Sequence, residues 1–313
     1  MKNMSRAVMK VRVPATSANL GAGFDAMGMA LSLYNTVTIK RLLPTGEFVA
    51  EVTGEEVKEL SDCKANLIIQ SYLEACSTWN ITEPKGFEMY SENVIPLNRG
   101  LGSSASAVVA GVLTANELNR VNASESDLLR IMTKIEGHPD NVAPCFLGGM
   151  AVGCWDGSDL RYVRLPPLPS DIYVVAAVPD VRIKTSEARK SLPEMVNFGD
   201  AVFNLGRSAL MAAAWATGQW NMLQWGMDDR LHQQYRAKLF PGGEVIIDRV
   251  RAMPECLGVA ISGSGPSVLA LSRENPRKVA EAMCRTFTEH GIGSLFFVFE
   301  GNAGGAEVDT NFE

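Results

Sequence analysis

The sequence lacks the patterns that identify the commonest nucleotide-binding and nucleic-acid-binding proteins. Neither Gly-x-x-x-x-Gly-Lys-Ser/Thr nor Gly-x-Gly-x-x-Gly occurs in its 313 residues. It has no cluster of Lys and Arg and a formal net charge of -6, so we expect no nucleic-acid partner. Apolar runs such as 209–216 are too short to cross a bilayer, and residues 1–10 lack the apolar core of a signal peptide. We therefore expect a cytoplasmic protein with no membrane partner.

Cysteine and histidine patterns are also sparse. The six cysteines form no Cys-x-x-Cys pair and lie in apolar contexts, as is typical of reduced thiols in a cytosolic protein. The three histidines lie far apart in the sequence, which gives no local support for a histidine-based metal site.

Strand-like and helix-like segments alternate along the chain, which predicts an α/β or α+β protein. The predicted strands are residues 9–13, 33–40, 48–52, 86–91, 172–178 and 294–300, with a strand, a glycine turn and a strand over 258–272. The predicted helices are residues 66–79, 104–119, 126–136, 186–192, 200–217, 243–251 and 276–289. Three prolines within 166–169 predict a boundary between two domains, 1–167 and 168–313.

Three segments rich in small residues carry the functional signal. The first, 14–25, reads as a tight loop between two apolar segments. The second, 96–106, has two glycines and then serines where a helix begins, so its backbone could approach a phosphate closely. A glycine turn with a serine N-cap is the alternative for that loop. The third, 260–267, taken alone, is equally consistent with a simple hairpin.

Residues 136–141 bring two carboxylates, an imidazole and an amide together where a helix is expected to end and a turn to begin. This combination suits a magnesium ligand and substrate contacts. A solvated polar helix end is the alternative.

With these three loops in this order, the chain resembles the superfamily of galactokinase, homoserine kinase, mevalonate kinase and phosphomevalonate kinase, the GHMP kinases. The loops are Pro14–Asp25, Gly-Leu-Gly-Ser-Ser-Ala at Gly100–Ala105, and the turn Gly263–Gly265. The match is closest to the homoserine kinase family, through the first loop and three further segments. These are His138–Pro144, Thr185–Arg189 and Tyr235–Gly242.

The resemblance implies a two-domain α+β GHMP kinase fold. The N-terminal domain would bind ATP and contain a left-handed βαβ crossover, and the C-terminal domain would be ferredoxin-like. ATP and substrate would lie in the cleft between them. A homodimer is implied as well.

The resemblance also implies roles for individual residues. The phosphates of ATP would contact the second and third loops: Pro96, Leu97, Asn98, Arg99, Gly100, Leu101, Gly102, Ser103, Ser104, Ala105, Ser106, Gly263, Ser264 and Gly265. Mg²⁺ would be held by Ser103 and Glu136, with Ser104 as the alternative hydroxyl. Only Gly137 separates Glu136 from His138 here, where many homoserine kinases have a longer loop.

L-Homoserine is a zwitterion, and the implied pocket matches both of its charges. Its carboxylate would bind Arg189 and Arg236, since guanidinium groups form paired hydrogen bonds with carboxylates. Its ammonium would bind Asp25 and Asn19. The residues that complete the pocket are His138 and Asn141, with Asn141 near the reacting hydroxyl and Asp140 as a possible base.

Other functions remain open at this point. The same fold could phosphorylate threonine, shikimate or mevalonate, could decarboxylate mevalonate diphosphate, or could act as a ligand sensor without catalysis.

Overall fold

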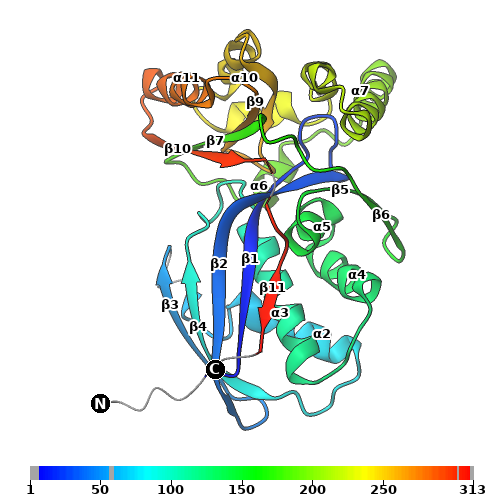
Figure 1. Ribbon diagram of the computed structural model, residues 1–313, viewed down its shortest axis with the longest axis vertical. Helices are drawn as coiled ribbons and strands as arrows, with labels where there is room; N and C mark the ends of the chain where they lie inside the picture. Colours follow the sequence, from blue (N-terminus) through cyan, green and yellow to red (C-terminus); the bar gives the residue numbers. More distant parts are fainter. Residues whose placement is uncertain (1–6, 56–59, 302, 311–313) are drawn as a thin grey trace.

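The structure, a computed structural model, describes residues 7–55, 60–301 and 303–310. Two β-sheets, each with its own helices, lie one above the other in an elongated molecule (Figure 1). None of the helices in these residues combines the length and apolar character needed to cross a bilayer.

The first sheet is built mainly from the N-terminal half of the chain. Its strand order is β11-β1-β2-β4-β3, with β5 paired to β2 and β6 paired to β5. β3 runs parallel to β4, whereas the other neighbours are antiparallel. The strands are β1 (Met9–Ala18), β2 (Met27–Leu43), β3 (Phe48–Gly54), β4 (Gly86–Asn93), β5 (Met150–Trp155), β6 (Leu160–Arg164) and β11 (Glu307–Asp309).

Among the described residues, four helices form the layer that covers this sheet and closes its core. Alternating apolar residues of β1 and β2 meet the apolar face of the long helix α3, so that side chains such as Val11, Val37 and Val109 are completely buried. The helices are α2 (Leu67–Thr78), α3 (Ser103–Leu118), α4 (Glu125–Glu136) and α5 (Pro139–Leu147).

The second sheet is antiparallel and has the order β10-β7-β9-β8. This order, with helices between β7 and β8 and between β9 and β10, is the β-α-β-β-α-β arrangement of a ferredoxin-like domain. The strands are β7 (Tyr173–Pro179), β8 (Cys256–Ile261), β9 (Val268–Ser272) and β10 (Ser294–Glu300). The main helices are α6 (Thr185–Lys190), α7 (Phe198–Thr217), α8 (Leu223–Gly226), α9 (Gln233–Arg236), α10 (Gly243–Arg251) and α11 (Pro276–Glu289), and the 3-10 turns are η1 (Trp220–Met222) and η2 (Ala237–Leu239).

The structure confirms the predicted alternation of strands and helices, with two corrections near the first loop. The predicted strand over 9–13 continues through Pro14 to Ala18, because the pairing with β2 shifts register between Pro14 and Ala15. Proline lacks an N–H and is tolerated at such an irregularity. β2 begins at Met27 rather than at 33, which leaves only residues 19–26 as a loop.

A third correction concerns the polar segment after Glu136. The expected turn is instead the start of a helix, α5, with His138 at its N-cap and Pro139 in its first turn. Proline suits this position, because its fixed φ is helical and its missing N–H is not needed there.

The chain passes from the first sheet to the second between Arg164 and Tyr173, and returns to the first sheet with β11. The division into 1–167 and 168–313 stays a prediction, as does the left-handed crossover.

Candidate functional site

The three glycine-containing loops meet between the two sheets. The Thr16 N–H, near the end of β1 and just before the first loop, donates to the carbonyl oxygen of Leu101 at 3.0 Å. The Ser262 hydroxyl, beside the third loop, donates to the carbonyl oxygen of Gly100 at 2.6 Å. Segments separated by more than 150 residues thus form one surface, as their proposed shared role requires.

Two glycines of the second loop make this contact possible. Gly102 has a φ of +71°, and a Cβ there would lie 1.8 Å from Oγ1 of Thr16. Gly100 has a φ of +78°, and its Cβ would lie 2.2 Å from the carbonyl oxygen of Ser262. Any other residue would be strained at either position and would push the loops apart.

The loop ends at the N-terminus of α3. Gly102 is the N-cap, and no side chain within the described residues caps the helix. The free N–H groups of the first turn and the positive end of the helix dipole therefore remain available to an anion.

Glu136 lies close to this helix start. It is the last residue of α4, and its Oε2 accepts a hydrogen bond from the Ser104 hydroxyl at 3.0 Å. Burial raises the pKa of Glu136, although His138 and Ser104 oppose the shift. The geometry therefore places Ser104, the alternative hydroxyl, beside Glu136, while a metal role for Ser103 stays a prediction.

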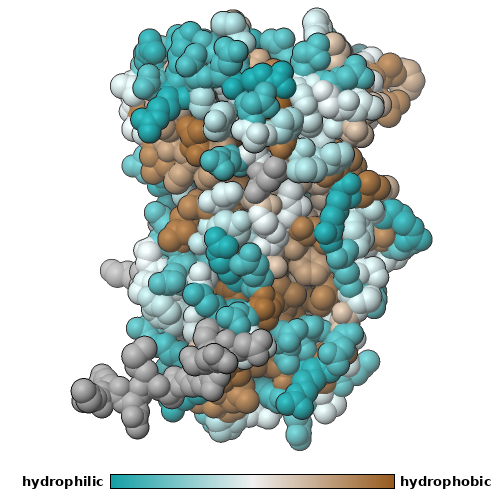
Figure 2. All heavy atoms as spheres, in the orientation of Figure 1, coloured by the Kyte–Doolittle hydropathy of each residue, from teal (hydrophilic) through white to brown (hydrophobic). Residues whose placement is uncertain are grey.

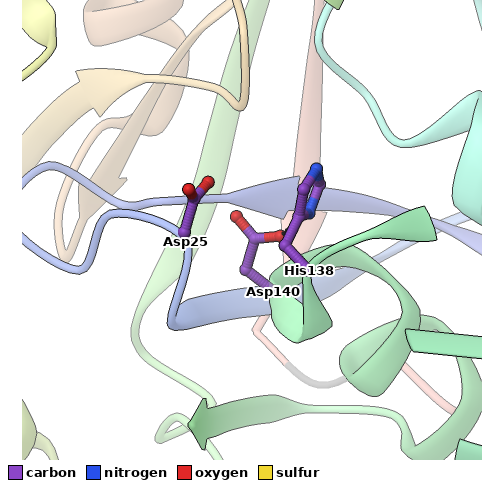
Figure 3. Close-up of side chains that lie close together, drawn as sticks. All are labelled: Asp25, His138 and Asp140. Atoms are coloured by element: carbon purple, nitrogen blue, oxygen red, sulfur yellow. Dashed lines mark hydrogen bonds and ion pairs between the residues drawn. The ribbon is translucent and has the colours of Figure 1, made fainter. Parts of the chain in front are cut away.

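A charged cluster of Asp25, His138 and Asp140 lies next to these groups (Figure 3). His138 and Asp140 come from the start of α5, and Asp25 comes from the loop before β2. The close approach of Gly28 to the backbone of α5 fixes their relative position, because a Cβ on Gly28 would lie 1.7 Å from the carbonyl oxygen of Asp140.

The charges in this cluster are paired. Nδ1 of His138 lies 2.5 Å from Oδ1 of Asp140. Burial would lower the pKa of His138, but Asp140, Glu136 and Asp25 together raise the pKa of His138 to about 9, so the ring is cationic at neutral pH. Although the three side chains are close enough to share a metal ion, a protonated imidazole is not a metal ligand.

Asp25 has its own cationic partner. The two guanidinium nitrogens of Arg189 donate to its two carboxylate oxygens, each at 2.9 Å. Burial would raise the pKa of Asp25, but the hydrogen bonds and charge of Arg189 lower it overall. The loop that carries Asp25 is held by Asn19, whose Oδ1 accepts from the Asp25 N–H and whose Nδ2 donates to the carbonyl oxygen of Gly263.

Arg236 supplies a second guanidinium, which is almost fully buried. It donates to the carbonyl oxygen of Gly263 at 2.8 Å, and its Nε has no hydrogen-bond partner among the described residues. Arg189 and Arg236 both pack over the ring of Phe24. Burial lowers the pKa of Arg236 to about 10, which still leaves it charged at neutral pH.

Comparison with known proteins identifies the family to which this chain belongs. Residues 66–149 match the GHMP kinases N terminal domain, and residues 210–289 match the GHMP kinases C terminal domain. A homoserine kinase of Carboxydothermus hydrogenoformans is 41% identical over 282 residues, which is 90% of each chain. The chain belongs to the homoserine kinase family of GHMP kinases. It is therefore a kinase, a transferase with the two-domain GHMP fold.

Further relatives agree with this assignment. A homoserine kinase of Halothermothrix orenii is 37% identical over 288 residues, or 91% of each chain. The crystal structure of a homoserine kinase from Cytophaga hutchinsonii matches with a TM-score of 0.86 and 32% identity over 99% of both chains.

Most of the predicted site residues of this GHMP kinase line one cleft of about 610 Å³. It is lined by Asn19, Asp25, Pro96, Asn98, Gly100, Leu101, Gly102, Ser103, Ser104, Glu136, His138, Asp140, Asn141, Thr185, Arg189, Arg236, Gly263 and Ser264. Asn141 is oriented by Thr16, whose hydroxyl donates to its Oδ1 at 2.8 Å.

Five predicted phosphate-loop residues do not line this cleft. Ala105 is fully buried, and Arg99 pairs with Asp180 at 2.7 Å. Gly265 supports its own turn, with its N–H donating to the carbonyl oxygen of Ser262. Leu97 and Ser106 line a second cavity instead.

Sequence reasoning missed this second cavity of about 860 Å³ in the GHMP kinase. It is mainly apolar and shares Asn98, Ser103 and Ser104 with the cleft, so the start of α3 lies between the two spaces. Its other residues are Val13, Asn35, Val37, Val52, Leu60, Asn66, Leu67, Ile68, Ser91, Asn93, Leu97, Ser106 and Ala107. The sequence also predicts no role for Thr16, Phe24 or Thr185, although all three lie in the segments that carry the family resemblance.

Proposed function

We propose that this enzyme transfers the γ-phosphoryl group of ATP to the side-chain hydroxyl of L-homoserine, forming O-phospho-L-homoserine for threonine biosynthesis. One observation carries the proposal: the uncapped start of α3 lies where an apolar cavity meets a cleft that is lined by two guanidinium groups and three carboxyl groups. The names of the relatives support the choice of substrate.

The two cavities suit the two ends of ATP. The apolar space lined by Val13, Val37, Val52 and Leu67 is suited to the base and ribose, because nucleotide bases bury well against apolar side chains. The phosphates would then lie along residues 98–104, where backbone N–H groups and the α3 dipole favour negative charge.

Ser104 and Glu136 fit a bound Mg²⁺. They offer a hydroxyl and a carboxylate oxygen 3.0 Å apart beside the phosphate loop, and Mg²⁺ prefers oxygen ligands together with substrate phosphates. When bound, Mg²⁺ would neutralise charge on the phosphate oxygens.

The cleft offers groups for both charges of an amino acid. The guanidinium groups of Arg189 and Arg236, which both line the cleft, would bind the carboxylate of homoserine. Asp25 would bind the ammonium through the lone pairs that Arg189 leaves free, and Asn19 would hold the Asp25 loop in place. Asn141 and His138 would lie near the hydroxyl.

In the transfer, a bond forms between the homoserine oxygen and the γ-phosphorus, and the bond from that phosphorus to the β,γ-bridging oxygen breaks to release ADP. The hydroxyl proton leaves for solvent. Asp140 is poorly placed to take it, because its carboxylate already binds the cationic His138. Orientation and charge neutralisation would therefore supply most of the rate.

A coupled ADP-release assay with Mg²⁺ and ATP tests this proposal directly. L-Homoserine, L-threonine, shikimate and mevalonate would be compared at equal concentrations. We expect L-homoserine to give at least about 100-fold higher kcat/KM than shikimate or mevalonate, because a site built for two charges rejects molecules that lack the ammonium group. L-Threonine carries both charges, so its turnover tests how strictly the cleft places the hydroxyl. Equal or better turnover of shikimate or mevalonate would refute the amino-acid assignment.

A cytoplasmic location and a homodimer, both expected from the sequence and its resemblance, remain part of this proposal.

A further inference from the structure

The imidazole of His232 lies inside the junction between the two halves of the molecule, which meet across its middle (Figures 1 and 2). His232 is the N-cap of α9, the short helix that carries Arg236, and its side chain is completely buried. It does not line the cleft and has no proposed contact with substrate. A buried imidazole needs a hydrogen-bond partner at each ring nitrogen, and these partners indicate what His232 does.

The two ring nitrogens of His232 reach two different parts of the substrate site. Nε2 lies 2.9 Å from the carbonyl oxygen of Gly21, in the loop that carries Asp25. Nδ1 lies 3.5 Å from Nη1 of Arg236, which also donates to the carbonyl oxygen of Gly263 at 2.8 Å. One side chain thus links a loop of the first sheet to an arginine that belongs to the second half.

These two partners fix one tautomer of the ring. A carbonyl oxygen only accepts hydrogen bonds, so Nε2 must carry the proton, and a guanidinium only donates, so Nδ1 must be the acceptor. Burial lowers the pKa of His232, and the charge of Arg236 lowers it further, whereas Asp229 and Asp25 oppose the shift. The ring is therefore neutral at neutral pH, with a donor toward Gly21 and an acceptor toward Arg236.

Ring packing holds His232 in this orientation. Its imidazole stacks on the ring of Phe24, with the ring centroids 4.9 Å apart and the planes 20° apart. The guanidinium groups of Arg189 and Arg236 lie 5.7 Å and 5.1 Å from the centroid of the same Phe24 ring. Because Phe24 directly precedes Asp25, a displaced His232 would disturb the groups proposed for both charges of the substrate.

The backbone on both sides of this contact is fixed as well. Oδ2 of Asp229 accepts a hydrogen bond from the His232 N–H at 2.9 Å, and Oδ1 accepts one from Nδ2 of Asn204 on α7 at 2.7 Å. Gly21 has a φ of +78°, and a Cβ there would lie 1.9 Å from the carbonyl oxygen of Met227. The imidazole therefore joins two segments that have little freedom of their own.

We propose that His232 is a positioning residue for the amino-acid substrate, because it sets the separation between the Arg236 guanidinium and the Asp25 carboxylate. This inference rests on the proposed function, in which these two groups bind the carboxylate and the ammonium of homoserine. Both charged groups of homoserine are attached to the same carbon atom, so the distance between them is fixed. If Arg236 and Asp25 drifted apart, the substrate would lose one contact or the other.

Steady-state kinetics of His232 variants of the full chain test the proposal. We expect His232→Ala to raise the KM for homoserine by about 30-fold and to change the KM for ATP by less than about threefold, since only the amino-acid site is misaligned. His232→Gln keeps an N–H near the position of Nε2, and His232→Asn keeps an oxygen near that of Nδ1, so each should recover part of the loss. An unchanged KM for homoserine in His232→Ala, or equal changes in both KM values, would overturn the proposal.

Val279→Ala is the matched control for a loss of stability alone. Val279 is completely buried on α11, a helix that supplies none of the described residues lining the cleft. The substitution should lower Tm through the cavity it creates and leave both KM values unchanged. If Val279→Ala raised the KM for homoserine as much as His232→Ala does, the effect would come from general destabilisation and the positioning role would be wrong.

Nitrogen NMR of the histidine side chains tests the geometry in the wild-type chain without any substrate. We expect the ring of His232, identified by the signals that His232→Gln lacks, to be neutral at neutral pH with its proton on Nε2. A cationic ring or a proton on Nδ1 would overturn the proposal. Failure of the proposed function would be recognised separately, because the wild-type chain would then release no ADP with homoserine.

Discussion

At the scale of single residues, Arg189 is important because it forms an ion pair with Asp25 and is proposed to bind the carboxylate of homoserine. Arg189→Ala should raise the KM for homoserine by about 10- to 100-fold and change the KM for ATP by less than about threefold. The reason is that the charge-assisted hydrogen bonds between Arg189 and the carboxylate of homoserine are lost. Steady-state kinetics with each substrate varied in turn would measure both values.

Lys190→Ala is the matched control for Arg189→Ala. It removes an exposed cation from the next position of α6 without touching the cleft, so both KM values should stay unchanged. An unaltered KM for homoserine in Arg189→Ala would remove Arg189 from the pocket.

Substitution of Asp140 distinguishes phosphoryl transfer that uses a general base from transfer that does not. Asp140→Asn leaves the side-chain volume unchanged but removes the charge that keeps His138 protonated. We expect kcat to fall by less than about 100-fold, since loss of a true general base costs about 10² to 10⁴. Complete loss of turnover, with thermal stability and ATP affinity preserved, would identify Asp140 as the base.

The sequence could not predict which of two neighbouring serines, Ser103 or Ser104, lies beside Glu136. Ser103 and Ser104 are adjacent and chemically identical, so no pattern tells them apart. Their side chains point about 100° apart around α3, and the packing of α3 against α4 brings Ser104 to Glu136.

At the scale of secondary-structure elements, the start of α3 depends on the absence of a side chain at its N-cap. Gly102→Ala should destabilise the protein by more than about 2 kcal/mol and raise the KM for ATP by at least about tenfold, because its Cβ would overlap Thr16 as well as strain a positive φ. Thermal denaturation and ATP-dependent kinetics provide the two measurements.

Gly218→Ala measures how much the backbone strain of a positive φ, without a steric overlap, contributes to the loss of stability. Gly218 caps the end of α7 with a φ of +70°, close to that of Gly102, but its Cβ would meet only atoms 3.7 Å or more away. We expect a loss of about 1 kcal/mol and unchanged kinetics. Equal effects from the two substitutions would show that loop contact at Gly102 is unimportant.

The elements themselves were largely predictable, because alternating and helical periodicities run through most of the chain. The start of α5 was missed although Pro139 is a usual first-turn residue, since the polar segment after Glu136 was expected to form a turn. The apolar cavity could not be predicted, because Val13, Val37 and Val52 look like ordinary strand residues. Only the arrangement of β1, β2 and β3 around the start of α3 leaves a space beside them.

At the scale of the whole molecule, Ser262 joins the two sheets. Its buried hydroxyl donates to the carbonyl oxygen of Gly100 and lies 2.8 Å from the hydroxyl of Ser17. Ser262→Ala should destabilise the protein by about 1–3 kcal/mol, lower Tm by several degrees and raise the KM for ATP, because buried partners lose their hydrogen bonds.

Thr288→Ala serves as the control, since that exposed hydroxyl donates to the carbonyl oxygen of Cys284 in its own helix. It should leave Tm and kinetics nearly unchanged. If Ser262→Ala lowered Tm but left the KM for ATP unchanged, the hydrogen bond from Ser262 to Gly100 would stabilise the association of the two halves without determining the conformation of the phosphate loop.

The return of β11 to the first sheet also constrains how the cleft can open. The polypeptide crosses between the halves twice, once after β6 and once after β10. Two connections restrict the relative movement of the halves more than a single connection would. We therefore expect the halves to move mainly as a hinge about these two crossings, which would return Arg189 and Asp25 to the same alignment after each turnover.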